Sequence, residues 1–402
     1  MRDAVIVEAV RSPIGRRAGG LGEVHPADLS AALLNALSER SGIDPAFVED
    51  VIWGCVAQVG EQAGNIARYA VLTAGWPESV PGTTIDRQCG SSQQAIHFAA
   101  ASVISGQCDV AVAGGVESMS RIPMGSARRA GPGVPSSSRL LRRYDGVEFS
   151  QGTGAEILAK RYDLSRTWLD EYSLESHARA AAAVDQGRFA KEIASIETPD
   201  GSVVLADEGI RRDSNMEKLA ALKPPFDANG RITAGNASQI SDGAAAVLIT
   251  TSERARSLGL TSLARIHTAT VVADDPVAML AGPIPATAKA LRLAGLGLDE
   301  IGAFEVNEAF ASVVGAWLKE TGARQELVNP HGGAIALGHP LGGSGARLAT
   351  TLLHHMQAEG IRYGLQTMCE AGGMANATIF ENLAPGAKRQ QPRQLKTAQN
   401  PF

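Results

Sequence analysis

The sequence predicts a layered α/β fold built from two similar halves. Short runs rich in β-branched residues alternate with Ala- and Leu-rich stretches of helical length over most of the chain, and this alternation is typical of α/β proteins. The same order of strands and helices occurs before and after a central segment of different composition, residues 119–236. Element order, more than residue identity, therefore indicates a duplicated unit that carries an insertion.

The N-terminal half is expected to comprise residues 1–118 together with about 237–258. Its β-branched runs predict strands, and its Ala-rich runs predict helices. The expected strands are 4–10, 50–53, 83–85 and 109–113, the last ending at Gly114 and Gly115, and the expected helices are 28–37 and 92–104.

The C-terminal half, residues 259–383, repeats this order. A Gly-rich turn at 332–345 is expected to open a helix that runs through His355. The expected strands are 264–273, 301–306, 363–368 and 376–380, and the other expected helices are 284–293 and 308–319.

The central segment, residues 119–236, is predicted to be an inserted loop domain. It carries a loop-like stretch at 126–141, rich in Arg, Pro, Gly and Ser, and a long helix at 166–187. The tail, residues 384–402, is rich in Gln, Lys, Arg and Pro and is expected to be disordered.

Composition and charge exclude several classes of function. The 402 residues are 44% apolar with a formal net charge of −5, so nothing calls for nucleic acid or an anionic membrane as a partner. The N-terminus lacks a signal-peptide pattern, and no apolar run reaches the roughly 18 residues of a membrane span. The four cysteines form no CxxC pair, so free thiols in the cytoplasm are expected, and a special cysteine is expected to be catalytic.

Cys89 is the first candidate for chemistry. It follows a predicted strand and precedes Gly90, where the chain is expected to turn sharply into a helix. The unpaired N–H groups at a helix N-terminus lower the pKa of a nearby thiol, which suits an acyl-accepting nucleophile. A buried structural cysteine is the alternative.

His339 is the second candidate. Pro340 and the surrounding glycines hold its imidazole on a closely approached backbone, which suits a general base or a hydrogen-bond donor to an oxyanion. A phosphate-binding glycine loop is the rival. However, a leucine, Leu348, stands where GxGxxG requires a third glycine, and GK[ST] is absent, so a dinucleotide site is disfavoured.

Cys369 and Asn307 are the third and fourth candidates, each at the end of a predicted strand. Alone, Asn307 could be a helix cap and Cys369 a small core residue. The spacing of cysteines and histidines contains no paired metal-ligand motif, so no metal is predicted.

Together these segments resemble the thiolase family, in the right order from about Val5 to about Asn382. The family's fold, an α/β/α/β/α layered core with an inserted loop domain, is expected with them. The matching segments are Cys89-Gly90-Ser91, Thr233–Ser238, Ser241–Ala244, Asn307–Phe310, Gly333–Gly345 and Cys369–Gly373.

The resemblance implies an acyltransferase that cleaves 3-oxoacyl-CoA with CoA and also runs the reaction backwards. Cys89 would attack the 3-keto carbon and keep the acyl group as a thioester. Cys369 would protonate the acetyl-CoA enolate and later deprotonate CoA. His339 would take the proton from Cys89 and, with a water held by Asn307, form an oxyanion hole.

Further residues follow from the same resemblance. Backbone N–H groups of Cys89 and Ala371 would form a second oxyanion hole, although the family usually has glycine where Ala371 stands. Ser238, Arg211 and Phe310 would contact CoA or the acyl substrate; for Arg211, a solvated surface charge is the alternative. The Arg-rich stretch would serve CoA phosphates or a subunit contact, or be a plain surface loop. CoA and acyl-CoA enter as substrates, no cofactor is expected to stay bound, and a homodimer or homotetramer is expected by analogy.

One departure from the family bears on the substrate. Thiolases that make acetoacetyl-CoA commonly carry His-Met-Gly in the insert, where this chain has Gln151-Gly152. Losing that bulk predicts a degradative thiolase that accepts acyl chains larger than acetoacetyl. Residues 86–96 and 368–373 also resemble bacterial thiolases of steroid or other ring-derived acyl-CoA breakdown.

Three other functions share part of this sequence pattern. The first is a biosynthetic acetoacetyl-CoA thiolase. The second, a decarboxylating ketoacyl synthase, is disfavoured because those enzymes resemble a Cys-His-His arrangement, whereas this chain offers Cys369 at the third place. The third is a catalytically silent acyl-CoA-binding relative, which should have lost site residues that are all present here.

Overall fold

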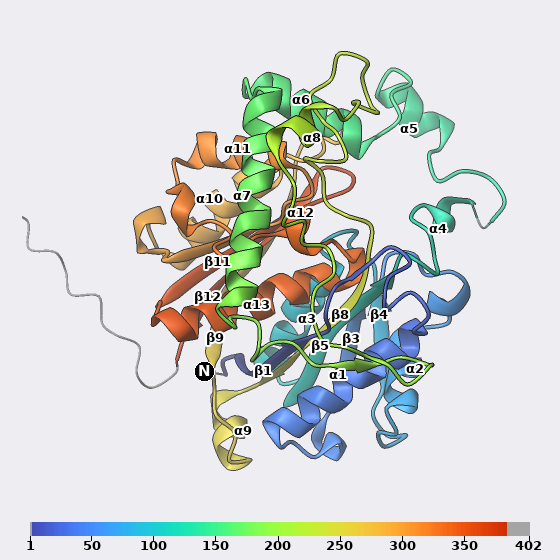
Figure 1. Ribbon diagram of the computed structural model, residues 1–402. Coiled ribbons are helices and arrows are strands. Elements are labelled where there is room, and N and C mark those ends of the chain that lie inside the picture. Colours follow the sequence, from blue (N-terminus) through green and yellow to red (C-terminus); the bar gives the residue numbers. More distant parts are fainter. Residues whose placement is uncertain (1, 130, 384–402) are drawn as a thin grey trace, which may run out of the picture.

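A computed structural model of the chain describes residues 2–129 and 131–383 (Figure 1). Its main feature is a mixed sheet with the strand order β10-β11-β12-β9-β1-β8-β5-β3-β4, to which β2 (Gly15–Arg16) adds through β8. The N-terminal strands join the C-terminal strands through two residue pairs, Val5 with Arg265 and Ile6 with Ala264. The sheet therefore consists of two half-sheets joined at a narrow seam.

The N-terminal half-sheet combines parallel and antiparallel strands. Strands β3 and β4 are parallel, β3 and β5 are parallel, and β8 runs antiparallel to both β5 and β1. Its strands are β1 (Val5–Arg11), β3 (Asp50–Gly54), β4 (Gly82–Ile85), β5 (Val110–Ser118) and β8 (Ser241–Thr250).

The C-terminal half-sheet has the same plan. Strands β10 and β11 are parallel, and β12 runs antiparallel to both β11 and β9. An isolated parallel bridge between Phe304 and Val328 takes the place that β4 has in the other half. The strands are β9 (Ala264–Ala273), β10 (Ala303–Val306), β11 (Tyr363–Glu370) and β12 (Met374–Asn382). The two halves are thus a structural duplication.

Helices complete a five-layer core. One outer layer packs on the N-terminal half-sheet and the other on the C-terminal half-sheet, while α3 and α13 lie between them in an apolar cluster drawn from both halves. Figure 1 shows this order, with the blue outer helices below and the orange ones above. The helices are α1 (Pro26–Ser41) and α2 (Ile66–Thr73), then α3 (Ser91–Ser105) and α13 (Ser344–Glu359), then α10 (Pro283–Ala294) and α11 (Ala311–Thr321).

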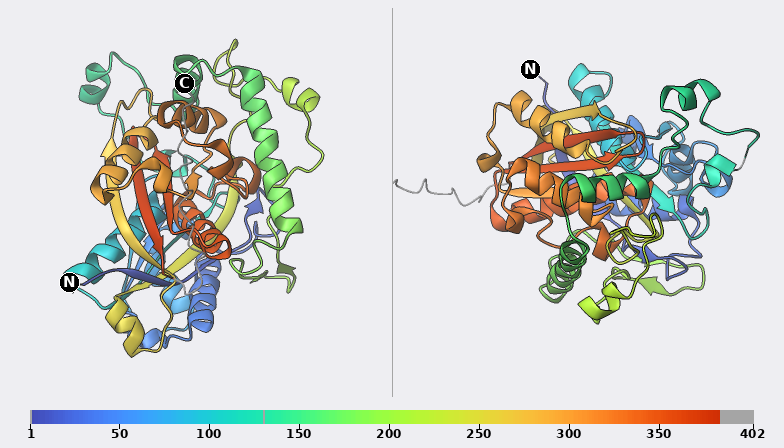
Figure 2. Two further views of the ribbon diagram at one scale, coloured as in Figure 1. Left: turned by 90° about the vertical axis from the view of Figure 1, so that its left-hand side faces the viewer. Right: turned by 90° about the horizontal axis from the view of Figure 1, so that it is seen from above.

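The segment between β5 and β8 lies over the C-terminal half. Helix α7 packs against α11 and α12, whereas α4 and α5 project away from the sheets (Figures 1 and 2). Its elements are α4 (Ser126–Arg129), α5 (Ser138–Arg143), α6 (Gln151–Arg161), α7 (Arg166–Asp185), α8 (Met216–Ala220) and the hairpin β6 (Ile196–Glu197) and β7 (Val203–Val204). Short helices α9 (Ser252–Ser257) and α12 (Ala334–Leu337) occur elsewhere.

Several expectations need correction. Strand β5 does not end at Gly114 but runs to Ser118, because it pairs with β8 over its whole length. Gly115 serves packing and not strand termination, since a β carbon there would lie 2.2 Å from the Gly342 carbonyl oxygen. The stretch 126–141 is partly helical. Helix α11 begins at Ala311 and not at Glu308, since the Ala311 N–H donates to the Asn236 carbonyl. The expected tail, 384–402, lies outside the described residues.

Over the described part of the chain, none of the helices combines the length and apolarity that crossing a membrane requires.

Candidate active site

Cys89 lies in the turn between β4 and α3. The residue before it, Gln88, has a left-handed backbone (φ 50°), which is uncommon for a residue with a side chain and marks local strain. The Gln88 N–H donates to Asp86 Oδ1 at 2.6 Å, and Ser91 Oγ accepts from the Arg87 N–H at 2.9 Å. The sharp turn expected at Gly90 therefore has its left-handed residue at Gln88, since Gly90 itself has φ −86°.

Gly90 explains how Cys89 reaches the other half of the molecule. A β carbon there would lie 2.0 Å from Glu370 Oε1 and 2.5 Å from Asn376 Oδ1. Only glycine allows the nucleophile turn to rest on the end of β11 and the start of β12. The close approach places Cys89 beside Cys369, the residue that precedes Glu370.

Cys369 is buried near the end of β11, where it pairs with Ala375 of β12. Burial raises its pKa well above the usual value, and the neighbouring Cys89 and Glu370 raise it further. The two thiols are therefore close enough for the charge of one to disfavour ionisation of the other.

His339 is buried, and its tautomer follows from its contacts. Ser344 Oγ donates to the Pro340 carbonyl at 2.8 Å and lies 2.6 Å from His339 Nδ1. Because the hydroxyl proton is used at Pro340, Ser344 Oγ accepts from Nδ1–H, which leaves the lone pair on Nε2. Burial first, and then Arg347, lowers the pKa of His339 to about 3. The imidazole is therefore neutral, with an acceptor nitrogen turned into the site.

Asn307 follows β10 and meets His339. Its Nδ2 lies 3.4 Å from His339 Nε2, and its backbone N–H donates to the Thr367 carbonyl, two residues before Cys369. Its Oδ1 is buried and accepts no hydrogen bond from any described residue. The next residue, Glu308, accepts from Tyr172 and Ser176 of α7, so the insert braces the Asn307 loop.

Glycines and one carboxylate hold the His339 loop on the N-terminal half. A β carbon on Gly342 would lie 2.4 Å from the Val116 carbonyl oxygen. The buried Glu117 carboxylate accepts from the N–H groups of Val56, Ala57 and Gly342 and from Gln62 Nε2, at 2.9–3.0 Å. The loop that carries the histidine is therefore anchored next to the turn that carries the nucleophile.

The expected lowering of the Cys89 pKa is wrong for this site. Burial raises the pKa of Cys89 to about 12, and Glu370, Glu117 and Asp86 add to the rise, while a backbone hydrogen bond opposes it. Desolvation outweighs the helix N-terminus because the thiol is only 3% exposed. Cys89 therefore rests as a thiol, and to act as a nucleophile it would require a base to take its proton.

Ala371 replaces the family's usual glycine without backbone strain. The residues with positive φ in this turn are Gly372 (φ 86°) and Gly373 (φ 79°), whereas Ala371 is not among the described residues in the left-handed region. Its N–H can therefore occupy the same place as that of a glycine.

The residues expected to contact CoA lie on neighbouring segments. The Ser238 N–H donates to the Ala309 carbonyl, next to Phe310. Gln239, adjacent to Ser238, donates to the Gly209 carbonyl at 2.8 Å, and Arg211 follows on an exposed stretch. The arginines of α4 and α5 are also exposed; they are Arg128, Arg129, Arg139, Arg142 and Arg143.

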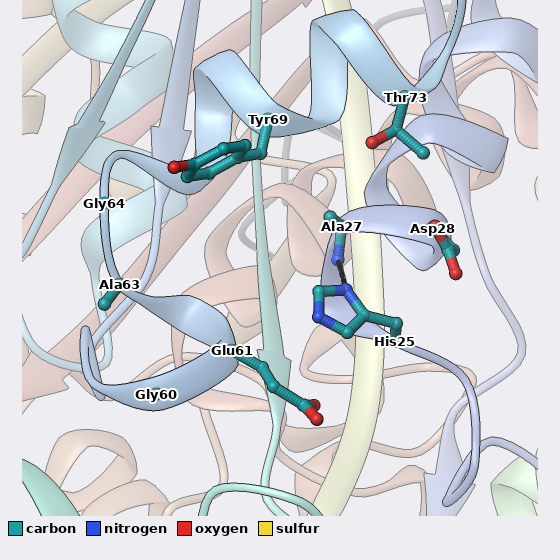
Figure 3. A pocket seen from close by; sticks show the side chains of 9 residues that line it. All are labelled: His25, Ala27, Asp28, Gly60, Glu61, Ala63, Gly64, Tyr69 and Thr73. Carbon is teal, nitrogen blue, oxygen red and sulfur yellow. Dashed lines mark hydrogen bonds between the residues drawn. The ribbon is translucent and has the colours of Figure 1, made fainter.

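A separate cavity of roughly 590 Å³ lies between the start of α1 and α2 (Figure 3). His25, Glu61 and Tyr69 line it, and the His25 ring accepts from the Ala27 N–H. Its lining contains neither thiol nor His339. This cavity is therefore separate from the cluster of Cys89, His339 and Cys369.

Four residues of the site escaped prediction. Ser344 sets the His339 tautomer, Gln88 strains the turn, Glu308 ties the insert to Asn307, and Glu370 faces Gly90. Ser344, Glu308 and Glu370 lie within the segments already singled out, so their sequence neighbourhood was a signal. A left-handed glutamine carries no comparable signal.

Comparison with known proteins gives consistent matches along the chain. A family model described as "Thiolase, N-terminal domain" matches residues 4–253, and one described as "Thiolase, C-terminal domain" matches residues 260–382. The "Steroid 3-ketoacyl-CoA thiolase FadA6" of Mycobacterium tuberculosis is 53% identical over 389 residues, 95% of each chain. The "3-ketoacyl-CoA thiolase" of Yersinia pestis is 47% identical over 393 residues, 95% of this chain and 100% of the relative. The enzyme of that name from Erwinia tasmaniensis is 46% identical.

Proposed function

The chain belongs to the thiolase family, and from this premise we propose that it cleaves 3-oxoacyl-CoA with CoA to acetyl-CoA and a shortened acyl-CoA. The same site would run the reverse Claisen condensation. The observation that carries the proposal is the contact of the Cys89–Gly90 turn with the end of β11, which brings the thiols of Cys89 and Cys369 together. The names of the relatives support the same reaction.

In the first half-reaction, Cys89 Sγ attacks the 3-keto carbon while its proton passes to the free Nε2 of His339. Collapse of the tetrahedral intermediate breaks the bond between C2 and C3. The acyl group stays on Cys89 as a thioester, and the electron pair leaves on acetyl-CoA as an enolate. The Cys369 thiol protonates that enolate carbon and becomes a thiolate.

In the second half-reaction, the Cys369 thiolate takes the proton of CoA. The CoA sulfur attacks the thioester, and the shortened acyl-CoA leaves. Cys89 departs as a thiolate and recovers its proton from His339. Each group returns to its starting protonation state, so the cycle needs no further acid or base.

Two sets of donors stabilise the negative oxygens formed on the way. Protonated His339 and a water bound to Asn307 face the thioester carbonyl of the acetyl-CoA unit, and the unpartnered Asn307 Oδ1 is suited to hold such a water. The N–H groups of Cys89 and Ala371 face the oxygen on the acylated Cys89. Each such donor typically contributes about 10²–10³ in rate.

CoA is bound by residues of the insert, of the segment that follows it and of the C-terminal half. Phe310 supplies an apolar wall, since it is 8% exposed and lies 6.3 Å from the Phe226 ring. Ser238 lies near the pantetheine, and exposed Arg211 lies near the adenine nucleotide. CoA and acyl-CoA are substrates, and no permanently bound cofactor takes part.

The acyl substrate is larger than acetoacetyl-CoA. Gly152 stands where acetoacetyl-forming thiolases carry a larger residue, although the Phe226 ring occupies part of the space: a β carbon on Gly152 would lie 2.2 Å from it. Phe226 is 47% exposed and can turn outward without emptying a packed core. The pocket therefore widens by moving one aromatic ring, and the steroid thiolase relative is consistent with a bulky substrate.

A panel of 3-oxoacyl-CoA substrates of increasing chain length and ring content tests this function. Thiolysis should favour the longer or bulkier acyl chains, with Cys89→Ser as the inactive control. Gly152→Met should shift the preference toward acetoacetyl-CoA. A strict wild-type preference for acetoacetyl-CoA contradicts the larger pocket and favours a biosynthetic enzyme.

Intact-mass measurement separates an enzyme from a silent acyl-CoA-binding relative. Mixing with acetyl-CoA should add one acetyl group, and Cys89→Ala should abolish the addition. A protein that binds acetyl-CoA without an adduct contradicts the proposed chemistry.

We also propose that the protein acts in the cytoplasm as a homodimer or homotetramer, the assembly expected from the family resemblance. Light scattering during size-exclusion chromatography tests the assembly. A monomer at micromolar concentration contradicts it.

A further inference from the structure

Glu370 is a buried carboxyl group without hydrogen-bond partners. The side chain is fully buried at the end of β11, and neither Oε1 nor Oε2 accepts a hydrogen bond from any described residue. An ionised carboxylate in such a place would lose its hydration without replacement, at a cost of several kcal/mol. The mechanism above does not use Glu370, so it does not explain why a carboxyl group is buried at this place.

A second acceptor oxygen lies close to Glu370. Glu370 Oε1 and Asn376 Oδ1 share the space where Gly90 lacks a side chain, since a β carbon there would lie 2.0 and 2.5 Å from them. Asn376 Oδ1 is also buried without a donor. Two acceptor oxygens side by side repel each other, unless one of them carries a proton.

The orientation of the Asn376 amide is fixed from its other side. Asn376 Nδ2 lies 3.2 Å from Gln94 Oε1 and 3.3 Å from His97 Nδ1. With Nδ1 accepting, His97 carries its proton on Nε2, which lies 2.7 Å from Thr378 Oγ1. Burial lowers the pKa of His97 to about 3, so this ring is neutral. The network therefore turns Asn376 Oδ1 toward Glu370.

We propose that Glu370 is a positioning residue that stands as an uncharged carboxylic acid, donates its proton to Asn376 Oδ1 and so keeps negative charge away from the two thiols. The hydrogen bond joins β11, which carries Cys369, to β12 and through it to α3, which carries Cys89 at its start. Loss of that one proton places a charge beside both thiols and opposes their ionisation. The effect of Glu370 on catalysis rests on the proposed function, whereas its protonation state can be tested without substrate.

The charged and titratable groups around Glu370 favour this state. Burial raises the pKa of Glu370 to about 8, with Arg87 opposing the rise and Asp86 adding to it. Glu370 in turn raises the pKa of Cys89 and of Cys369. From the other elements packed here, Glu117 also acts on Cys89, and His97 of α3 stays neutral. The acid form thus predominates near neutral pH and gives way above it.

Alkylation of Cys89 by iodoacetamide, followed by peptide mass spectrometry from pH 6 to 9.5, tests the proposal without turnover. Glu370→Gln keeps a donor toward Asn376 but cannot ionise. Wild type and variant should react alike at pH 6–7, and the variant should react faster above pH 8, by up to about tenfold for each unit of pKa coupling. Glu305→Gln, another buried carboxyl of the same sheet with a pKa near 8, should follow the wild type.

Two results overturn the proposal. A constant excess of the variant rate from pH 6 upward means that Glu370 is ionised throughout, and superposed rates at every pH mean that it does not act on Cys89. Thiolysis should show the same pattern, with a Glu370→Gln to wild-type ratio of kcat/KM near one at pH 7 that increases above pH 8.

A measurement on the wild-type protein tests the proposal even if the Glu370→Gln variant fails to fold. Nitrogen-15 NMR of His97 should show the Nε2–H tautomer at pH 7. The Nδ1–H tautomer would require Asn376 to be turned around, with its amide donating to an ionised Glu370, and would refute the proposal. Because alkylation and NMR need no substrate, an inactive thiolase and a charged Glu370 are distinguishable outcomes.

Discussion

Equivalent strands in the two halves of the molecule each carry a buried glutamate at or near their end. The surroundings of the two carboxyl groups are opposite. Strand β5 of the N-terminal half carries Glu117 near its end, and β11 of the C-terminal half ends at Glu370. Four donors surround the Glu117 carboxylate, whereas no described residue donates to Glu370. The duplicated fold therefore has two similar positions. Glu117 occupies one as a structural anchor, and Glu370 occupies the other without such bonds to the described residues.

The contrast extends to the loops that follow the paired strands. In the N-terminal half, Cys55 after β3 lies in the apolar core around α1 and α2. In the C-terminal half, Asn307 after β10 turns its amide to His339. In the proposed mechanism the N-terminal half contributes the nucleophile, in the turn before α3, and the C-terminal half contributes the acid, the base and the amide. Function in this fold requires both halves, but each supplies a different kind of group.

The largest effect is expected from Cys89→Ala, which removes the chemical contribution of the N-terminal half. Thiolysis should decrease by on the order of 10⁴-fold or more, because the variant lacks the thiol that holds the acyl chain as a thioester in the proposed mechanism. A coupled assay of acetyl-CoA release measures it. The matched control is Cys108→Ala, a buried cysteine of the same half that touches no site residue named above; it should retain most activity. Equal losses in both variants would contradict the assignment.

Cys369→Ala should separate the two halves of the reaction. Loss of the acid that protonates the enolate should slow thiolysis by about 10²–10⁴-fold. The acetyl adduct on Cys89 should still accumulate from acetyl-CoA, more slowly, as an intact-mass shift. A variant that cleaves normally, or one that never forms the adduct, would show that the roles of the two thiols are wrongly divided.

Asn307→Ala tests the amide at the end of β10. Loss of one oxyanion contact should lower kcat by about 10²–10³-fold with little change in KM, since the contact strengthens only as charge develops. Steady-state kinetics give both constants. A raised KM with unchanged kcat would mean that Asn307 binds substrate and does not stabilise the transition state.

Glu117→Gln should have the smallest catalytic effect and a clear effect on stability. The new amide places a donor among three backbone N–H groups and removes charge-assisted hydrogen bonds, each worth about 1.5–3 kcal/mol. We expect unfolding by urea at pH 7 to show a loss in this range. Glu370→Gln is the matched comparison and should not lower stability at that pH, because ionisation of Glu370 in the unfolded state already reduces wild-type stability there. A larger loss from Glu370→Gln would reverse the comparison of the two glutamates.

Wild-type stability should also decrease with rising pH relative to Glu370→Gln. The pKa of Glu370 is raised from 4.5 to about 8 in the folded protein, so the folded state binds the extra proton. The associated stability is complete below the unfolded value and is lost as pH rises through about 8. Urea titrations at pH 5, 7 and 9 measure this trend, and parallel curves for wild type and variant would contradict it.

The sequence allowed the element order and the reactive groups to be predicted where local pattern carries the information. Strand β9 has the expected bounds, 264–273, and Cys89, His339, Cys369 and Asn307 stand at strand ends or beside glycines that a single sequence can reveal. Family resemblance, confirmed by the domain matches, added the roles and the layered fold.

The remaining features depend on burial and on contacts between distant parts of the chain, so they could not be predicted from local sequence. All ten residues of β8 are buried, and its small residues at 244–246 give neither alternation nor a β-branched run, so it was not predicted as a strand. Gly90 suggested a turn, yet its purpose is contact with Glu370, some 280 positions further along the chain. No local sequence pattern distinguishes Glu117, whose carboxylate has four hydrogen-bond donors, from Glu370, to which no described residue donates.

The position of β8 has a consequence for how the protein is made. It lies between β1 and β5 in the sheet, but the ribosome synthesises it only after the whole insert. At roughly 5–20 residues per second, the nascent chain waits on the order of ten seconds between completing β5 and receiving its neighbour. During that interval two open strand edges face each other across an empty place, and this is the stage at which a chaperone would have most to protect.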